Sequence, residues 1–124
     1  EADLAAYRYR QVILILSNPE QRQAYPPEAG YYLGEACRLR GEPGDDEAAE
    51  HEFNSVIEAV PLFAPAHRAL GMLHFKRGDR ARAAPLLRHY LELAPAAADR
   101  GYVEYYLTLM ESQKPVDNDS ATPP

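Results

Sequence analysis

The stretch from Ala64 to Pro95, APAHRALGMLHFKRGDRARAAPLLRHYLELAP, decides how this chain folds. In its first half, small or apolar residues recur at helical spacing until Gly78 and Asp79 interrupt the pattern. Asp79 is a helix-capping residue type, and a second apolar face follows it. The two faces consist of Ala66, Ala69, Leu70, Met72 and Leu73, and of Ala83, Leu86, Leu87, Tyr90, Leu91 and Ala94. The stretch predicts a helical hairpin, and further helices are needed to cover its apolar faces.

This hairpin resembles a tetratricopeptide repeat (TPR), whose order is Leu-Gly, turn glycine, small residue, large apolar residue and terminal proline. That order is carried by Leu70-Gly71, Gly78, Ala83, Leu87 and Pro95. It recurs upstream, with a short insertion around Pro43, at Leu33-Gly34, Gly41, Ala49, Phe53, Val56 and Pro61. Gly30 and His67 replace the usual Trp, and Cys37 and His74 replace the usual Tyr. The resemblance implies an all-α, TPR-like superhelix of about six antiparallel helices.

We expect a single helical domain over residues 1–112. It comprises repeats at about 27–63 and 64–97, flanking helices at 3–17 and 99–112, and a connector at 21–27. Asn18-Pro19 should end the first helix, and Pro85 should bend the helix that contains it because proline has no N–H for the Ala81 carbonyl. Residues 113–124 are rich in Pro, Asp, Ser and Thr, so we expect a mobile tail there.

Composition narrows the function classes. The net charge of −6 argues against general nucleic-acid binding. The longest aliphatic run, Val12–Leu16, is far shorter than the roughly 20 residues that cross a bilayer. The single cysteine gives no internal disulfide framework. Because Glu1 is not an initiator Met, we expect a mature chain or a fragment whose targeting signal is missing.

The sequence indicates no catalytic or metal site. His67 and His74 lack the i, i+4 spacing of helical metal ligands and fall on packing positions of the repeat. Cys37 also falls on a packing position, which favours a small buried hydrophobe over a nucleophile. The carboxylates of Glu47, Glu50 and Glu52 favour a solvated helix face over a catalytic group. We therefore expect no metal, no cofactor and no enzymatic activity.

The remaining candidate is a surface. The resemblance implies that the first helix of each repeat lines a concave face, which yields these partner-binding candidates: Tyr31, Tyr32, Glu35, Arg38, Leu39, Arg68, Met72, Phe75 and Lys76. Aromatic residues, Met and Arg dominate interface energetics. We expect Tyr31 and Arg68 to be exposed, whereas Tyr32 and Phe75 either face the groove or pack against neighbouring helices. Glu35 would repel the terminal carboxylate that some TPR grooves bind.

The sequence thus predicts a scaffold that binds a partner protein or peptide, with an aromatic or aliphatic segment that carries an acidic group. Weak similarity of residues 90–95 and 100–107 to bacterial envelope repeat proteins favours an accessory role in a cell-envelope assembly and a periplasmic or envelope location. Two alternatives remain open. One is a regulatory TPR domain of, or beside, a larger enzyme such as a protease. The other is a module that self-associates through its first helix, as a homo-oligomer.

Overall fold

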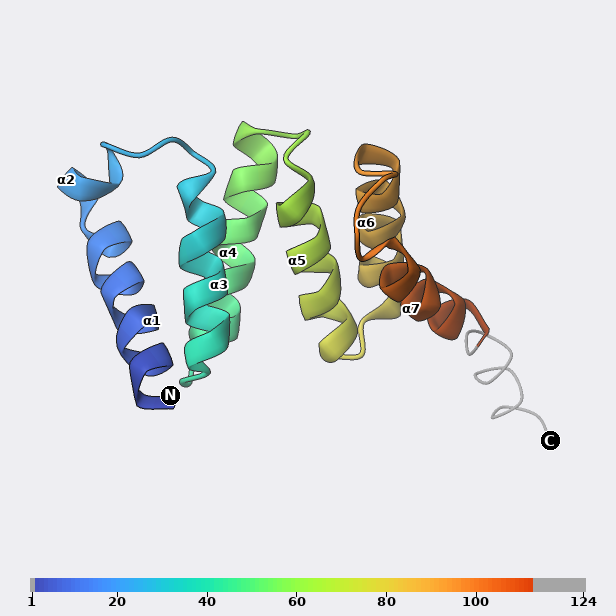
Figure 1. Ribbon diagram of the computed structural model, residues 1–124, viewed down its shortest axis with the longest axis horizontal. Coiled ribbons are helices and arrows are strands. Elements are labelled where there is room, and N and C mark those ends of the chain that lie inside the picture. Colours follow the sequence, from blue (N-terminus) through green and yellow to red (C-terminus); the bar gives the residue numbers. More distant parts are fainter. Residues whose placement is uncertain (1, 113–124) are drawn as a thin grey trace.

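The computed structural model describes residues 2–112, and every regular element in that range is an α-helix (Figure 1). The helices are α1 (Ala2–Ser17), α2 (Pro19–Arg22), α3 (Ala29–Arg40), α4 (Asp45–Ala59), α5 (Ala64–Lys76), α6 (Arg80–Leu93) and α7 (Arg100–Ser112). The predicted all-α class is confirmed. The tail expected at residues 113–124 lies outside the described residues. None of the helices within residues 2–112 is long and apolar enough to cross a lipid bilayer.

The short helix α2 is an element that the sequence did not predict. It begins where a connector was expected, directly after Asn18-Pro19. The Asn18 side-chain oxygen accepts hydrogen bonds from the backbone N–H groups of Glu20, at 2.9 Å, and Gln21, at 3.2 Å. Pro19 occupies the first turn, where its missing N–H costs nothing. The same two residues therefore end α1 and begin α2.

The helices form a row of neighbours (Figure 1). The pairs α3–α4 and α5–α6 are hairpins, and α4 packs against α5 to join them. Helix α1 packs against α3 at one end of the row, and α7 packs against α6 at the other. The first and last helices therefore lie at opposite ends of the molecule.

Two hydrophobic clusters hold this row together. One joins buried residues of α1, α3, α4 and α5, and the other joins α6 to α7, with partly buried residues of α5 packed against it. Phe53 and Leu87 are fully buried, one in each cluster. The residues predicted to be buried from the repeat pattern are all buried: Leu33, Phe53, Leu70, Leu73 and Leu87.

Two helical glycines allow the close approach within the hairpins. A Cβ atom added to Gly34 would lie 2.5 Å from the ring of Phe53, and one added to Gly71 would lie 2.7 Å from a methyl carbon of Leu87. Carbon atoms at ordinary contact are separated by about 3.5–4.0 Å. The Leu-Gly pairs therefore have a packing role: a larger residue would push α3 away from α4, or α5 away from α6.

The turn between α5 and α6 forms as predicted. Gly78 has φ 82°, a left-handed conformation that favours glycine. The Asp79 carboxylate accepts a hydrogen bond from the backbone N–H of Arg82 at 3.1 Å, so it caps α6. Pro85 lies on the exposed side of α6, where water can satisfy the carbonyl of Ala81 that the proline leaves without a donor.

Candidate functional site

A hollow of about 380 Å³ lies between α3, α5 and α7, and we call it the α5 groove. Helix α5 supplies most of its lining because residues three or four positions apart share one helix face. Helix α3 contributes two charged residues and α7 contributes one tyrosine. The lining residues are Glu35, Arg38, Arg68, Ala69, Met72, Leu73, Phe75, Lys76 and Tyr102.

Most of the residues that the sequence nominated for partner binding lie together in this groove. Those that line it are Glu35, Arg38, Arg68, Met72, Phe75 and Lys76. Tyr31, Tyr32 and Leu39 are not part of its lining, although Leu39 is exposed. The packing of the helices thus brings residues of α3 and α5 to the same hollow.

The two adjacent tyrosines of α3 differ in exposure, and Tyr31 does not have the exposure that was expected. Tyr31 is partly buried, with its ring centroid 6.1 Å from that of Phe53 and 5.7 Å from that of Phe63. Burial, followed by the charge of Glu35, raises the pKa of Tyr31. Tyr32 is 58% exposed and lines a different hollow beside α1. The expectation that Tyr31 is the exposed residue was wrong, because the ring packs against Phe63 in the α4–α5 connection.

On the α3 side of the groove, Glu35 and Arg38 neutralise each other. The Arg38 guanidinium donates two hydrogen bonds to the Glu35 carboxylate, from Nε at 3.1 Å and from Nη2 at 2.9 Å. The hydrogen bond to Glu35 raises the pKa of Arg38. Such two-point pairing fixes both side chains. Neither charge is therefore fully available to a bound partner.

On the α7 side, Arg68 belongs to a hydrogen-bonded network. Its Nε donates to Oδ2 of Asp99, while the hydroxyl of buried Tyr90 donates to Oδ1 of the same carboxylate at 2.6 Å. The Arg68 guanidinium carbon also lies 5.9 Å from the centre of the Tyr102 ring, within cation–π range. Arg68 was expected to be exposed, but these contacts leave it only partly exposed. The network fixes Tyr102 and Arg68 at the edge of the groove.

Opposing effects set the pKa values in this network. Burial alone would raise the pKa of Asp99, but the hydrogen bonds from Tyr90 and Arg68 outweigh it and lower that pKa. Burial and the hydrogen bond to Asp99 raise the pKa of Tyr90 to about 12. Asp99 is therefore ionised and Tyr90 is protonated at neutral pH, which are the states that the observed hydrogen bonds require.

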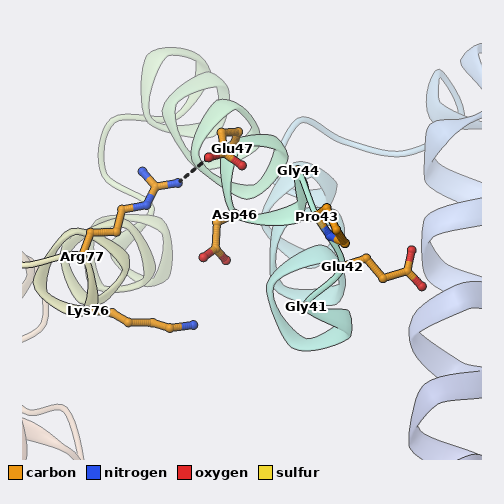
Figure 2. Close-up of a pocket in the computed structure, with 8 residues that line it drawn as sticks. All are labelled: Gly41, Glu42, Pro43, Gly44, Asp46, Glu47, Lys76 and Arg77. Atoms are coloured by element: carbon orange, nitrogen blue, oxygen red, sulfur yellow. Dashed lines mark ion pairs between the residues drawn. The ribbon is translucent and has the colours of Figure 1, made fainter.

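Lys76 differs from the two groove arginines. Within residues 2–112 its amine forms no hydrogen bond or ion pair. It lines both the α5 groove and a second hollow of about 380 Å³ beside the α3–α4 loop (Figure 2). In that second hollow Arg77 pairs with Glu50 at 2.6 Å and approaches Glu47 at 3.9 Å. Lys76 is therefore the groove cation that remains available for an external negative charge.

Sequence reasoning missed two residues of the site. Tyr102 lies on α7, which was predicted as a flanking helix but not as a wall of the groove. Asp99 lies in the connection before α7, where its backbone carbonyl accepts from the N–H of Val103. An acidic residue directly before a helix is a capping signal, and such a signal gives no information about a distant partner. Its pairing with Arg68 depends on the placement of α5 and could not be read from spacing.

The histidines and the cysteine that could suggest chemistry are packed into the fold. His67 and His74 are both buried, as their packing positions predicted, and Nε2 of His67 donates to the Pro61 carbonyl at 2.7 Å. Cys37 is buried, and burial followed by the charge of Asp45 raises the pKa of its thiol. A raised pKa disfavours the reactive thiolate. In the part of the chain that the structure describes, no three His, Cys, Asp or Glu residues are grouped to hold a metal ion.

Comparison with known proteins adds no name to this site. No protein-family model matches the sequence, and no curated protein matches it.

Proposed function

We propose that this chain is a TPR-type helical repeat protein that binds an extended segment of a partner protein in the α5 groove. The observation that carries the proposal is the convergence of residues from α3, α5 and α7 on one hollow that has an apolar floor and charged rims. Exposed or half-buried Tyr, Phe, Met and Arg side chains are those that dominate binding energy at interfaces. The order of helical hairpins, with glycines at their closest approach, supports the repeat assignment.

The charges of the groove specify the partner. Because Glu35 engages Arg38 and Asp99 engages Arg68, the α5 groove offers an external acidic group one uncommitted cation, Lys76. Met72 and Phe75 provide the adjacent apolar surface. A partner segment should therefore carry an aromatic or aliphatic residue for this surface and an acidic residue for Lys76. Exposed charges of this kind accelerate and orient association more than they hold a complex.

The biological setting that we propose is a non-enzymatic accessory role in a bacterial cell-envelope assembly. The support for this setting is the weak resemblance of residues 90–95 and 100–107 to envelope repeat proteins that the sequence suggested. A regulatory domain of, or beside, a larger enzyme such as a protease would use the same groove, so binding data for the groove apply to both settings.

The test is a selection of random 12-residue peptides on the immobilised full chain, followed by kinetic measurement of the enriched peptides. Met72→Ala should mainly speed dissociation, by roughly 5–30-fold if Met72 is an anchor. Lys76→Glu should mainly slow association of peptides that contain an acidic residue, and high salt should reduce the difference between this variant and the unmodified chain. Glu58→Lys is the matched control, because Glu58 is an exposed residue of α4 that does not line the groove.

The outcomes separate cleanly. Enriched peptides that bind the Met72 and Lys76 variants as tightly as the unmodified chain would show that the α5 groove is not the binding surface. If the selection yields no peptide that binds the unmodified chain better than it binds the Met72→Asp variant, the proposed function itself is contradicted. Circular dichroism of each variant should show unchanged helical content, since all substituted side chains are at least partly exposed.

A further inference from the structure

Nδ1 of His67, a residue of α5, is a buried ring nitrogen without a hydrogen-bond partner. The residue is only 5% exposed, and its other ring nitrogen, Nε2, lies 2.7 Å from the carbonyl oxygen of Pro61. In the part of the chain that the structure describes, Nδ1 of His67 is the one buried side-chain nitrogen or oxygen for which no partner is found. Buried polar atoms are nearly always hydrogen-bonded, so this exception calls for an explanation.

The contact with Pro61 determines which nitrogen of His67 is protonated. A carbonyl oxygen can only accept a hydrogen bond, so Nε2 carries the proton and donates it. In the neutral imidazole, Nδ1 is then the unprotonated nitrogen and has a free lone pair. A histidine that binds a metal ion has the same arrangement, in which one ring nitrogen donates to an oxygen and the other provides the lone pair.

A second histidine with this arrangement faces His67 from α6. The ring centres of His67 and His89 are 4.7 Å apart, and the ring planes meet at 67°. Nδ1 of His89 lies 3.2 Å from a carboxylate oxygen of Glu92. The carboxylate can only accept, so Nδ1 carries the proton and Nε2 of the neutral ring has the lone pair. Backbone carbonyls and carboxylates are the usual acceptors behind metal-binding histidines, and this pair has one of each.

The separation of the two rings suits a shared metal ion. A bond of about 2.0–2.1 Å from Zn²⁺ to a ring nitrogen places the ion about 3.2 Å from the centre of that imidazole. Two imidazoles on one ion then have ring centres roughly 4.5–5.2 Å apart, for bond angles from about 90° to the tetrahedral value. The 4.7 Å between His67 and His89 falls in this range. Since the rings pack edge to face, Nε2 of His89 reaches the ion by rotation of its side chain, which is 45% exposed.

We propose that His67 and His89 bind one divalent transition-metal ion of the zinc, nickel or copper class between α5 and α6. Imidazole nitrogen is a ligand type that suits these ions. No group of three His, Cys, Asp or Glu residues within the described chain could hold a metal, so water completes the coordination of this two-histidine site. Permanent structural zinc sites use four protein ligands. The ion held here is therefore exchangeable and responds to the metal concentration around the protein.

The ion joins the open end of the α5–α6 hairpin. His67 lies in the first turn of α5 and His89 in the second half of α6, so both are far from the turn at Gly78 that closes the other end. A ligand that binds the folded state and not the unfolded chain stabilises the fold. Neither histidine lines the α5 groove, so the metal site does not depend on the proposed function.

Sequence spacing pointed to a different pair of histidines. It compared His67 with His74 on the same helix, found no spacing suitable for metal ligands, and led to the expectation of no metal. The ring contact of His67 is instead with a histidine of the next helix, and it depends on the packing of α5 against α6. An ion held by His67 and His89 would overturn the expectation of no metal.

Isothermal titration calorimetry of the chain without a histidine tag, with ZnCl₂ and separately with NiCl₂, tests the site. We expect one ion per chain. His89→Gln changes a partly exposed side chain, so it should fold, and it should weaken binding by at least about 10-fold because one of two protein ligands is lost. His67→Gln should have the same effect, and circular dichroism shows whether this buried substitution keeps the helices. His51→Gln is the matched control, because His51 is an exposed histidine of α4, and it should bind as the unmodified chain does.

Thermal denaturation gives a second, independent readout. Saturating Zn²⁺ should raise the Tm of the unmodified chain and of His51→Gln, EDTA should reverse the rise, and His89→Gln should not show it. Affinity that is unchanged in both His67→Gln and His89→Gln would place the ion elsewhere and overturn the proposal. Absence of binding at about 1 mM of either metal would also overturn it. So would a rise in mass from 13.9 kDa to twice that value on addition of Zn²⁺, measured by light scattering, because the ion would then bridge histidines of two copies.

Discussion

Asp99, in the connection before α7, accepts hydrogen bonds from both Arg68 of α5 and Tyr90 of α6. One carboxylate thereby links three consecutive helices at the rim of the α5 groove. Arg68, one of the cations that the sequence assigned to partner binding, is paired instead with an acidic residue of the same chain. This pairing determines the charge of the groove and the attachment of α7 to the rest of the fold.

Replacement of Asp99 by Asn should destabilise the protein by roughly 1–3 kcal/mol at neutral pH, because it removes hydrogen bonds made to a charged group. The pKa of Asp99 is lower in the folded state than its usual value of 3.8, so the ionised carboxylate contributes stability above about pH 4. That contribution should disappear as pH falls through the lowered pKa. Urea denaturation of both proteins at several pH values measures it, and a difference that stayed constant down to pH 2 would contradict the network.

The decrease in folding stability at alkaline pH should depend on Tyr90. Its pKa is raised from 10.0 to about 12 in the folded state, so the folded protein keeps a proton that the unfolded chain loses. The contribution of the protonated Tyr90 to stability should be constant below pH 10 and should be lost between pH 10 and 12. Tyr90→Phe removes that part of the pH dependence while it keeps the buried ring. Denaturation curves at pH 8, 10 and 11.5 make the comparison, with Tyr105→Phe as an exposed control.

Replacement by alanine should have opposite effects on stability at two helical glycines, Gly34 and Gly101. A Cβ at Gly34 would collide with fully buried Phe53, so Gly34→Ala should cost roughly 1–3 kcal/mol through overpacking. A Cβ at Gly101 would meet no atom within 4 Å, so Gly101→Ala in α7 should be neutral or stabilise by up to about 1 kcal/mol. Thermal denaturation followed by circular dichroism measures both. Equal effects at the two positions would argue against close packing of α3 on α4.

Substitution of Leu70 tests whether the apolar face predicted for residues 64–78 is part of the core. Leu70 is buried where α5 meets its neighbours, so Leu70→Ala should cost roughly 2–5 kcal/mol. Leu62, in the α4–α5 connection, is exposed, and its replacement by Ala should change stability by less than about 0.5 kcal/mol. Chemical denaturation midpoints compare the two leucines. A midpoint for Leu70→Ala that matched the unmodified protein would exclude Leu70 from the core.

Local pattern was sufficient for the helices and for much of the core. The apolar period of residues 64–95, the Gly78-Asp79 turn and the Leu-Gly pairs predicted a hairpin whose buried residues are now seen in place. The two flanking helices, expected at 3–17 and 99–112, begin and end within one residue of those bounds, since glycine, proline, Asn and Asp act through their own backbone conformations. The short helix α2 was missed because Asn18-Pro19 is a signal to stop one helix and also a signal to begin the next.

The groove shows what spacing alone cannot provide. The resemblance to a repeat family implied that Arg68, Met72 and Lys76 share one side of α5, and these residues do line the same groove. It does not reveal which neighbour covers that face, so Tyr31 and Tyr32 were assigned in the wrong order of exposure.

The sequence by itself determined the secondary structure, the turn positions and the set of residues able to form a core, because these depend on interactions within about one or two helical turns. Tertiary structure alone decided the charge and the limits of the α5 groove. Asp99 is 31 residues from Arg68 along the chain, and Tyr102 reaches the groove from another helix. Their positions follow from how α6 and α7 pack on α5, which is set by the summed burial of many side chains and not by any single local signal.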